Sequence, residues 1–253
     1  MRNTDSPEER FAQDGFVRIE RFCSPAQVAE VLAEIDRYIA EVVPAIPNTD
    51  AFYEDKSRPE TLKQLVRLAD HDRYFHDLLH RGAMPQMAAL LLGEESRPIN
   101  QQIFIKPPGG LSKATPPHQD GFYFHLEPCS ALTLWLALDD VDEENGCLHF
   151  VRGSHLRGVR DHQRTQTLGF SQGVPDFGNR KDLADEVACP AAAGDLIAHH
   201  ALTIHRAGAN RAADRQRRAV GMIYYGASAR ERTQEHEAYQ RELADDLRKA
   251  GKI

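Results

Sequence analysis

The fold and the chemistry of the chain are decided by one stretch, Pro116-Pro117-His118-Gln119-Asp120-Gly121-Phe122-Tyr123-Phe124-His125. It contains an imidazole and a carboxylate two residues apart, at His118 and Asp120. On an extended backbone their side chains point to the same face, because strand side chains alternate with period two. Two imidazoles and one carboxylate with open positions opposite are the usual ligands of the non-haem Fe(II) that activates oxygen. The stretch therefore supplies two thirds of such a metal site.

The His-x-Asp pattern is weak evidence when it is taken alone. The chain has 12 histidines and 38 acidic residues among 253 positions, so chance supplies roughly two matches to His-x-Asp/Glu. A second match, His125-Leu126-Glu127, follows directly. For either match, the alternative is a surface turn or a hydrogen-bonded core histidine. The rest of the chain must decide between these interpretations.

The composition is that of a globular protein with a substantial core. Hydrophobic residues make up 41% of the chain and charged residues 27%. A net charge of −7 argues against nucleic acid or an anionic membrane as a partner. We expect a cytoplasmic location, because the first residues lack the apolar core of a signal peptide and no apolar run reaches membrane-spanning length. The four cysteines include no Cys-x-x-Cys pair, which predicts reduced thiols.

The first 97 residues predict a helical layer. Residues 11–19 have the pattern of a helix end, a glycine turn and a short strand. Ser24 and Pro25 begin a helix as N-cap and first-turn residues, and apolar residues then recur at helical spacing up to Pro44. We expect that apolar face to pack on a larger body. Residues 49–57 are expected to be loop, and three shorter helices are expected between residues 59 and 92.

From residue 98 the sequence changes to short apolar runs bounded by Gly, Pro and Asp. Short strands at such spacing favour a sandwich or jelly roll. The predicted fold is therefore mainly β, a double-stranded β-helix (a cupin-like jelly roll) with an N-terminal helical layer. The predicted strands are residues 100–106, 131–138, 147–151, 195–200, 203–205 and 217–225.

We expect a single domain over residues 1–253. It consists of a helical support (1–97), a jelly-roll core (98–226) with an insert (158–188), and a C-terminal helix (229–253). The insert is polar and poorly periodic, and a loop of that length inside a compact domain is usually a lid or a disordered segment. The second imidazole of a facial triad would come from His205, with His199 and His200 as competing candidates.

Several short blocks follow one another in register along the second half of the chain. They are Lys106-Pro107-Pro108, His118-Gln119-Asp120, Trp135, Asn145-Gly146-Cys147-Leu148, Gly153-Ser154-His155, Gly194-Asp195, His200-Ala201-Leu202-Thr203-Ile204-His205, Asn210 and Arg217-Arg218-Ala219-Val220. Together these blocks resemble the phytanoyl-CoA 2-hydroxylase family of Fe(II)/2-oxoglutarate dioxygenases. The N-terminal Asp14-Gly15-Phe16-Val17 and the Ser24-Pro25 helix also look like that family.

The resemblance implies that His118, Asp120 and His205 bind the iron. It also implies that Arg217 binds the distal carboxylate of 2-oxoglutarate, for which a planar guanidinium fork is well suited. The alternative for Arg217 is a solvated basic patch with its neighbours Arg215 and Arg218, and for those two the patch is the better interpretation.

The remaining candidates for cosubstrate binding rest on the same resemblance. Trp135 matches a tryptophan beside the cosubstrate and Thr133 shares its strand face, although both could be core residues. Lys63 stands where the family can place a second lysine, with an exposed helix lysine as the alternative. Ala207 departs from the family, which can carry a hydroxyl two residues after the distal histidine. A second contact to the cosubstrate would then be lost.

The implied reaction uses Fe(II) and O2 to convert 2-oxoglutarate into succinate and CO2 while a small organic metabolite is hydroxylated or otherwise oxidised. The aromatic run 122–124 would form a wall on the substrate side, or simply part of the core. A halogenase is disfavoured, because Asp120 occupies the place that chloride would need. A jelly-roll binding protein that is non-catalytic or uses another metal is the other alternative.

Overall fold

Two antiparallel β-sheets form the body of the protein in a computed structural model, which describes residues 5–165, 172–233 and 241. The larger sheet has the strand order β1-β11-β6-β13-β4-β3-β2, and the smaller has the order β10-β7-β12-β5. A further two-stranded sheet pairs β8 with β9. The strands are β1 (Phe16–Ile19), β2 (Ala51–Tyr53), β3 (Leu62–Val66), β4 (Ser96–Lys106), β5 (Thr115–His118), β6 (Ala131–Ala137), β7 (Leu148–Val151), β8 (Gln163–Arg164), β9 (Gln172–Gly173), β10 (Glu186–Cys189), β11 (Leu196–His200), β12 (His205–Ala207) and β13 (Arg217–Gly226).

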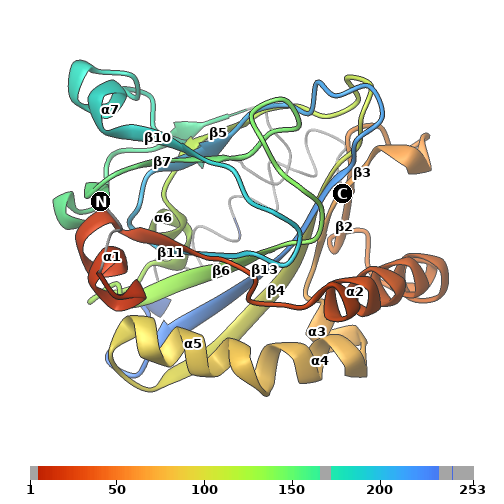
Figure 1. The fold of residues 1–253 in the computed structure, drawn as a ribbon, viewed down its shortest axis with the longest axis horizontal. Coiled ribbons are helices and arrows are strands. Elements are labelled where there is room, and N and C mark those ends of the chain that lie inside the picture. The colour runs from red at the N-terminus through yellow and green to blue at the C-terminus, as the bar shows by residue number, and fades with distance from the viewer. Residues whose placement is uncertain (1–4, 166–171, 234–240, 242–253) are drawn as a thin grey trace.

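Helices lie along the outer side of the larger sheet, and the smaller sheet lies on its opposite side (Figure 1). The α-helices are α1 (Pro7–Asp14), α2 (Pro25–Arg37), α3 (Leu68–His71), α4 (Arg73–His80), α5 (Ala83–Leu92), α6 (Asp120–Phe124) and α7 (Arg180–Asp185). Helix α2 continues into a π-helical turn (Tyr38–Val42), and the 3-10 turns are Val43–Ala45, Pro59–Thr61 and Ser154–Arg157. The mainly β fold with a helical layer is confirmed.

The central strand β6 shows why the apolar run 131–138 forms a buried strand. All seven residues of β6 are buried. Leu132, Leu134 and Leu136 belong to the cluster that packs against the helices, whereas Trp135 and Ala137 belong to the cluster between the two sheets. A strand covered on both faces has apolar residues at consecutive positions, because each face meets a core of its own. Strand β6 therefore separates the helical layer from the interior of the jelly roll.

The N-terminal helices begin where the sequence predicts. Ser24 accepts a hydrogen bond from the backbone of Gln27, and the Gln27 side chain accepts from the backbone of Ser24. This reciprocal capping box satisfies two backbone donors at the start of α2. Helix α1 ends at Gly15, which takes a left-handed φ of 83°. A Cβ at Gly15 would lie 2.4 Å from the His155 ring and 2.5 Å from the Thr203 hydroxyl, so glycine is required there on both grounds.

Residues 51–53 and 62–66 form strands where the sequence predicted loop and helix. Strands β2 and β3 add to the edge of the larger sheet beyond β4. Gln64 is buried there and donates a hydrogen bond to Gln102 across the β3–β4 pair at 2.6 Å. The prediction failed because both strands are short, and Lys63 and Gln64 interrupt the apolar alternation that marks a strand. The three expected helices are present as α3, α4 and α5.

The insert 158–188 is not one irregular loop in its described part. It contains β8, β9, α7 and the start of β10, and residues 166–171 lie outside the described residues. Its role as a lid stays a prediction. The expected C-terminal helix at 229–253 falls mostly outside the described residues. In the described part of the chain, no helix has both the length and the apolar character needed to span a membrane.

Candidate metal centre and cosubstrate site

The metal motif lies where β5 meets α6. The extended backbone reaches Gln119, with φ −124° and ψ 126°, and Asp120 is the first residue of a short helix. The expectation of an extended stretch therefore holds up to Gln119 and fails beyond it. His118 and Asp120 still meet, because the His118 Nε2 atom lies 3.5 Å from the Asp120 Oδ1 atom.

The second imidazole is brought in by sheet pairing. His205, the first residue of β12, lies directly opposite His118 of β5, and the two ring centres are 4.2 Å apart. The His205 Nε2 atom lies 3.7 Å from the Asp120 Oδ1 atom. One ligand-type atom from each of the three residues lies within 4.8 Å of the others. The geometry is that of a group that can hold a metal ion.

Both imidazoles have the tautomer that a metal ligand needs. The Nδ1 atom of His118 lies 2.8 Å from the carbonyl oxygen of Pro116, and the Nδ1 atom of His205 lies 3.0 Å from that of Thr203. A carbonyl only accepts, so each Nδ1 carries the hydrogen and each Nε2 keeps its lone pair toward Asp120. Such backbone contacts fix the orientation of ligating histidines. Two neutral imidazoles and one carboxylate fit Fe(II).

The electrostatics favour the same protonation states. Burial alone would raise the pKa of Asp120, but the imidazoles of His205, His118 and His199 outweigh burial and hold this pKa well below its ordinary value. Burial, followed by the nearby His118 and His199, holds the pKa of His205 well below its ordinary value. Asp120 is therefore ionised and His205 neutral at neutral pH, as metal binding requires.

His199 and His200, the competing candidates, lie in different surroundings. The His199 Nε2 atom lies 3.2 Å from the Asp120 Oδ2 atom, whereas His118 lies nearest the Oδ1 atom. The Nδ1 atom of His200 instead accepts a hydrogen bond from the backbone of Leu202 at 3.0 Å. Burial lowers the pKa of His200 to about 4. The described cluster able to hold a metal contains neither of them.

Arg217 is buried at the start of β13, with 3% of its surface exposed. Its guanidinium carbon lies 5.6 Å from the centre of the Trp135 ring, and its Nε atom is buried without a hydrogen-bond partner. Burial lowers the pKa of Arg217 to about 10. Arg215 and Arg218, by contrast, form ion pairs at 2.6 Å with Glu144 and Asp139. Of these three arginines, Arg217 is the one placed for an anionic ligand.

Lys106, which the sequence did not single out as a site residue, lies opposite Arg217 on β4. Its Nζ atom donates to the carbonyl oxygen of Lys113 at 2.6 Å. Burial and then the positive charge of Arg217 hold the pKa of Lys106 well below its ordinary value. Two buried basic side chains in adjacent strands favour an anionic ligand beside them, because an anion would stabilise their charged forms. The proximity of Lys106 to Arg217 follows from the β4–β13 register and could not be read from the sequence.

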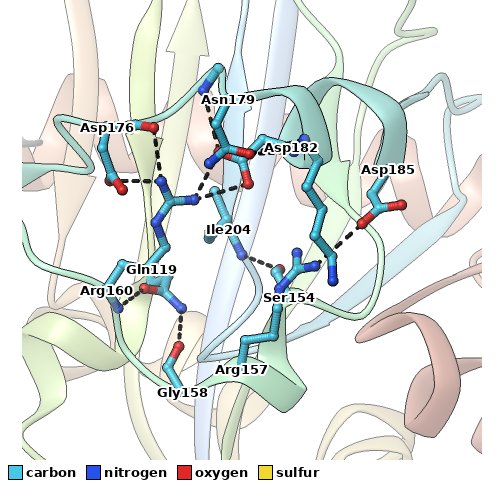
Figure 2. A network of polar contacts seen from close by, with 12 residues as sticks. Gln119, Ser154, Arg157, Gly158, Arg160, Asp176, Asn179, Asp182, Asp185 and Ile204 are labelled. Atoms are coloured by element: carbon cyan, nitrogen blue, oxygen red, sulfur yellow. Dashed lines mark hydrogen bonds and ion pairs between the residues drawn. The ribbon is translucent and has the colours of Figure 1, made fainter.

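Gln119, the residue between the two metal-binding candidates, attaches the insert to this site (Figure 2). Its side chain accepts from the backbone N–H of Arg160 at 2.8 Å and donates to the carbonyl oxygens of Gly158 and Leu202 at 2.9 and 2.6 Å. Its own backbone N–H donates to the His162 Nε2 atom at 3.0 Å. The start of the insert is thus bound to the metal motif through fully buried Gln119.

The aromatic residues 122–124 do not all have the same surroundings, although the sequence offered two alternatives for the run as a whole, a wall on the substrate side or part of the core. The Phe122 ring stacks on His162 with the centres 4.3 Å apart, and the Tyr123 hydroxyl donates to the carbonyl oxygen of Gln172 at 2.9 Å. Both side chains therefore face the insert. Phe124 is 8% exposed and packs 5.2 Å from the Tyr225 ring, so it belongs to the core.

A family model described as phytanoyl-CoA dioxygenase matches residues 11–219. The chain belongs to this family. A "Probable alpha-ketoglutarate-dependent hypophosphite dioxygenase" of Stutzerimonas stutzeri is 27% identical over 216 residues, which cover 83% of this chain and 74% of that protein. A phytanoyl-CoA dioxygenase domain-containing protein 1 of Bos taurus is 28% identical, over 83% of this chain and 86% of that protein.

Solved structures of similar fold carry the expected groups. The epimerase SnoN from nogalamycin biosynthesis, in complex with Fe3+, alpha ketoglutarate and nogalamycin RO, is 28% identical with a TM-score of 0.69, over 89% of this chain and 84% of that one. EvdO2 from Micromonospora carbonacea var. aurantiaca, complexed with 2-oxoglutarate, is 26% identical with a TM-score of 0.70, over 89% and 91%. The chain is an oxygenase that depends on Fe(II), 2-oxoglutarate and O2. A non-catalytic binding protein is not favoured.

Two positions in this member of the phytanoyl-CoA dioxygenase family concern the second contact to the cosubstrate. Lys63 lies on strand β3, not on a helix, and only 10% of its side chain is exposed. It forms an ion pair with Glu54 at 2.9 Å, so the expectation of an exposed helix lysine was wrong. Ala207 is 2% exposed on β12 and has no side-chain polar group.

Proposed function

We propose that His118, Asp120 and His205 bind the Fe(II) and that Arg217 binds the distal carboxylate of 2-oxoglutarate. The strongest support is the convergence of the three ligand-type atoms within 4.8 Å. Both histidine Nδ1 atoms are engaged by backbone carbonyls, which leaves each Nε2 atom available as a ligand. When bound, the iron and 2-oxoglutarate supply the oxidising chemistry, in which O2 yields succinate, CO2 and an oxidised substrate.

The cosubstrate role of Arg217 rests on its burial and on the lack of an acidic partner at its Nε atom. A guanidinium donates two parallel hydrogen bonds to a carboxylate, and such charge-assisted bonds are strong where water is excluded. Trp135 lies against the guanidinium and would hold it in place. Lys106 adds a second positive charge from the neighbouring strand. A dicarboxylate reaching from the metal toward β13 would neutralise this pair of cations.

The proposed substrate is a small organic molecule that enters between the insert and the aromatic residues after Asp120. Phe122 and Tyr123 contact the described ends of the insert through His162 and Gln172. The named relatives act on compounds as different as hypophosphite and a nogalamycin derivative, so the substrate class cannot be carried over from them. We propose that the insert sets the choice, and that the protein works in the cytoplasm, where its four free cysteines stay reduced.

The test is a substrate screen that reads succinate release from 2-oxoglutarate in the presence of Fe(II) and O2. The parent is expected to form succinate slowly alone and faster with a productive substrate. The matched control is His205→Ala, which should form none under either condition. Succinate formation by His205→Ala at the parental rate would contradict the proposed ligand set.

A further inference from the structure

The two oxygens of Asp120 have separate partners. The Oδ1 atom faces the two ligand histidines, at 3.5 Å from the His118 Nε2 atom and 3.7 Å from the His205 Nε2 atom. The Oδ2 atom accepts a hydrogen bond from the Thr133 hydroxyl at 2.7 Å and lies 3.2 Å from the His199 Nε2 atom. Thus one oxygen points toward the metal position, and the other is held by the larger sheet.

The larger sheet places both of these partners by register. Thr133 on β6 lies directly opposite His199 on β11, so the two side chains project from neighbouring strands onto the same face. They are 6% and 2% exposed. The His199 ring is further enclosed by the rings of Phe150 and His205, whose centres lie 5.4 and 4.4 Å away. Neither partner can leave Asp120 without repacking the core.

The protonation of His199 follows from this contact. An ionised carboxylate only accepts hydrogen bonds, so the Nε2 atom of His199 must carry the hydrogen that it donates to Asp120. Its Nδ1 atom is buried without a hydrogen-bond partner among the described residues. Burying an unsatisfied nitrogen lowers stability. A histidine at this position is therefore costly for the fold, and its benefit lies in the bond to Asp120.

We propose that His199 and Thr133 are positioning residues that restrict Asp120 to binding the metal through Oδ1 alone. This inference rests on the proposed function of Asp120 as a ligand. A carboxylate can bind a metal through one or both oxygens, and a second oxygen would take a position that the cosubstrate or O2 requires. Two hydrogen bonds to Oδ2 oppose that arrangement. His199 acts through Asp120 and is not itself a ligand, since it contacts the Oδ2 atom whereas His118 and His205 lie nearest the Oδ1 atom.

The test compares paired substitutions in the full-length protein titrated with Co(II) without oxygen. His199→Phe keeps a ring but cannot donate, whereas His199→Gln keeps an N–H donor; Thr133→Val and Thr133→Ser form the equivalent pair. Loss of hydrogen bonds to a ligating carboxylate typically weakens metal binding ten- to a hundredfold. We expect His199→Phe and Thr133→Val to show that loss together with a changed Co(II) visible spectrum. His199→Gln and Thr133→Ser should recover most of the affinity and the parental spectrum.

Thermal unfolding of the metal-free proteins separates positioning from folding. The metal-free His199→Phe protein should unfold cooperatively and close to the parental temperature, because removal of the unsatisfied buried Nδ1 atom offsets the lost hydrogen bond to Asp120. If His199→Phe keeps the parental Co(II) affinity and spectrum while His118→Ala binds no Co(II), the positioning role is wrong and the proposed ligand set stands. If His199→Phe abolishes binding as completely as His118→Ala and His199→Gln does not recover it, His199 is a ligand and the inference is overturned. Parental Co(II) binding by His118→Ala would instead overturn the ligand set itself.

Discussion

The chain contains the same short pattern twice within ten residues, and in the described structure the first copy belongs to the candidate metal centre whereas the second does not. In the first copy, the side chains of His118 and Asp120 are only 2% and 18% exposed. Strand β12 brings His205 opposite His118. In the second copy, Glu127 is 71% exposed and pairs with Arg232 at 3.2 Å. The pattern sets which groups are available, and the strand placed opposite decides whether they converge.

The largest effect should come from removing a ligand of the first copy. His118→Ala, Asp120→Ala and His205→Ala should each abolish succinate formation, because two remaining ligands do not hold Fe(II) in place. His125→Ala and Glu127→Ala in the second copy are the matched controls and should retain most of the activity. In each variant, Fe(II) titration measures metal binding, succinate release measures activity, and thermal unfolding reports on the fold. Full activity of His205→Ala would break the comparison and favour His199 as the ligand.

A similar contrast between neighbours exists on β13 and predicts the next largest effect. Arg217→Ala should weaken 2-oxoglutarate binding about ten- to a hundredfold, since a hydrogen bond to a charged group contributes about 1.5–3 kcal/mol. Arg217→Lys should recover part of it, because an ammonium lacks the two-pronged geometry. Fe(II) binding should not change.

The measurement for Arg217 is a 2-oxoglutarate titration of the Fe(II)-loaded protein without oxygen, followed by the charge-transfer band. Arg215→Ala and Arg218→Ala are the controls, because both side chains already have acidic partners. If Arg218→Ala weakens 2-oxoglutarate binding while Arg217→Ala binds it like the parent, then Arg218, and not Arg217, binds the cosubstrate.

The ion pairs of the insert predict a smaller effect, on stability. Arg160 holds Asp182, which is 4% exposed, at 2.8 Å (Figure 2). Arg160→Ala should lower the free energy of unfolding by about 1–3 kcal/mol, because a buried carboxylate loses its charged partner. Arg157→Ala removes a more exposed pair with Asp185 and should cost about 0–1 kcal/mol. Urea unfolding of both variants tests the difference, and equal losses would contradict it.

The smallest effect concerns pH. Burial lowers the pKa of His162 to about 4 in the folded protein, below the roughly 6.5 of an unfolded histidine. The unfolded state then binds more protons between these values, so the stability that neutral His162 contributes is complete above pH 6.5 and is lost as the pH falls toward 4. Between pH 7 and 5 the loss should be about 1–2 kcal/mol. His162→Gln should flatten the stability profile measured by urea unfolding, and a profile as steep as that of the parent would contradict this expectation.

Sequence reasoning predicted what depends on local pattern. The apolar run of β6, the Ser24 cap and the positions of the long core strands β4 and β13 can each be recognised from consecutive residues. The candidate triad was assembled from one local motif and a family resemblance, and the structure brings those three residues together.

What the sequence did not reveal depends on register between distant strands. Lys106 stands beside Arg217, and His199 beside Thr133, because of pairings across β4–β13 and β6–β11. A shift of one residue in either pairing would turn these side chains to the other face. No spacing along the chain records such a register. The short strands β2 and β3 were missed for a related reason, since they are stabilised mainly by pairing with the sheet that they join.

The attachment of the insert through Gln119 has a consequence for how this enzyme can change its substrate. The Gln119 side chain forms these hydrogen bonds with main-chain atoms, the carbonyl oxygens of Gly158 and Leu202 and the N–H of Arg160, whereas its backbone N–H donates to the His162 ring. Main-chain groups are the same whatever side chains a segment carries. Most side chains of the insert can therefore be exchanged, by mutation or by grafting a segment from another enzyme, while the side-chain anchor of Gln119 persists. Under the proposal that the insert sets substrate choice, that choice and the ligand geometry are free to evolve separately.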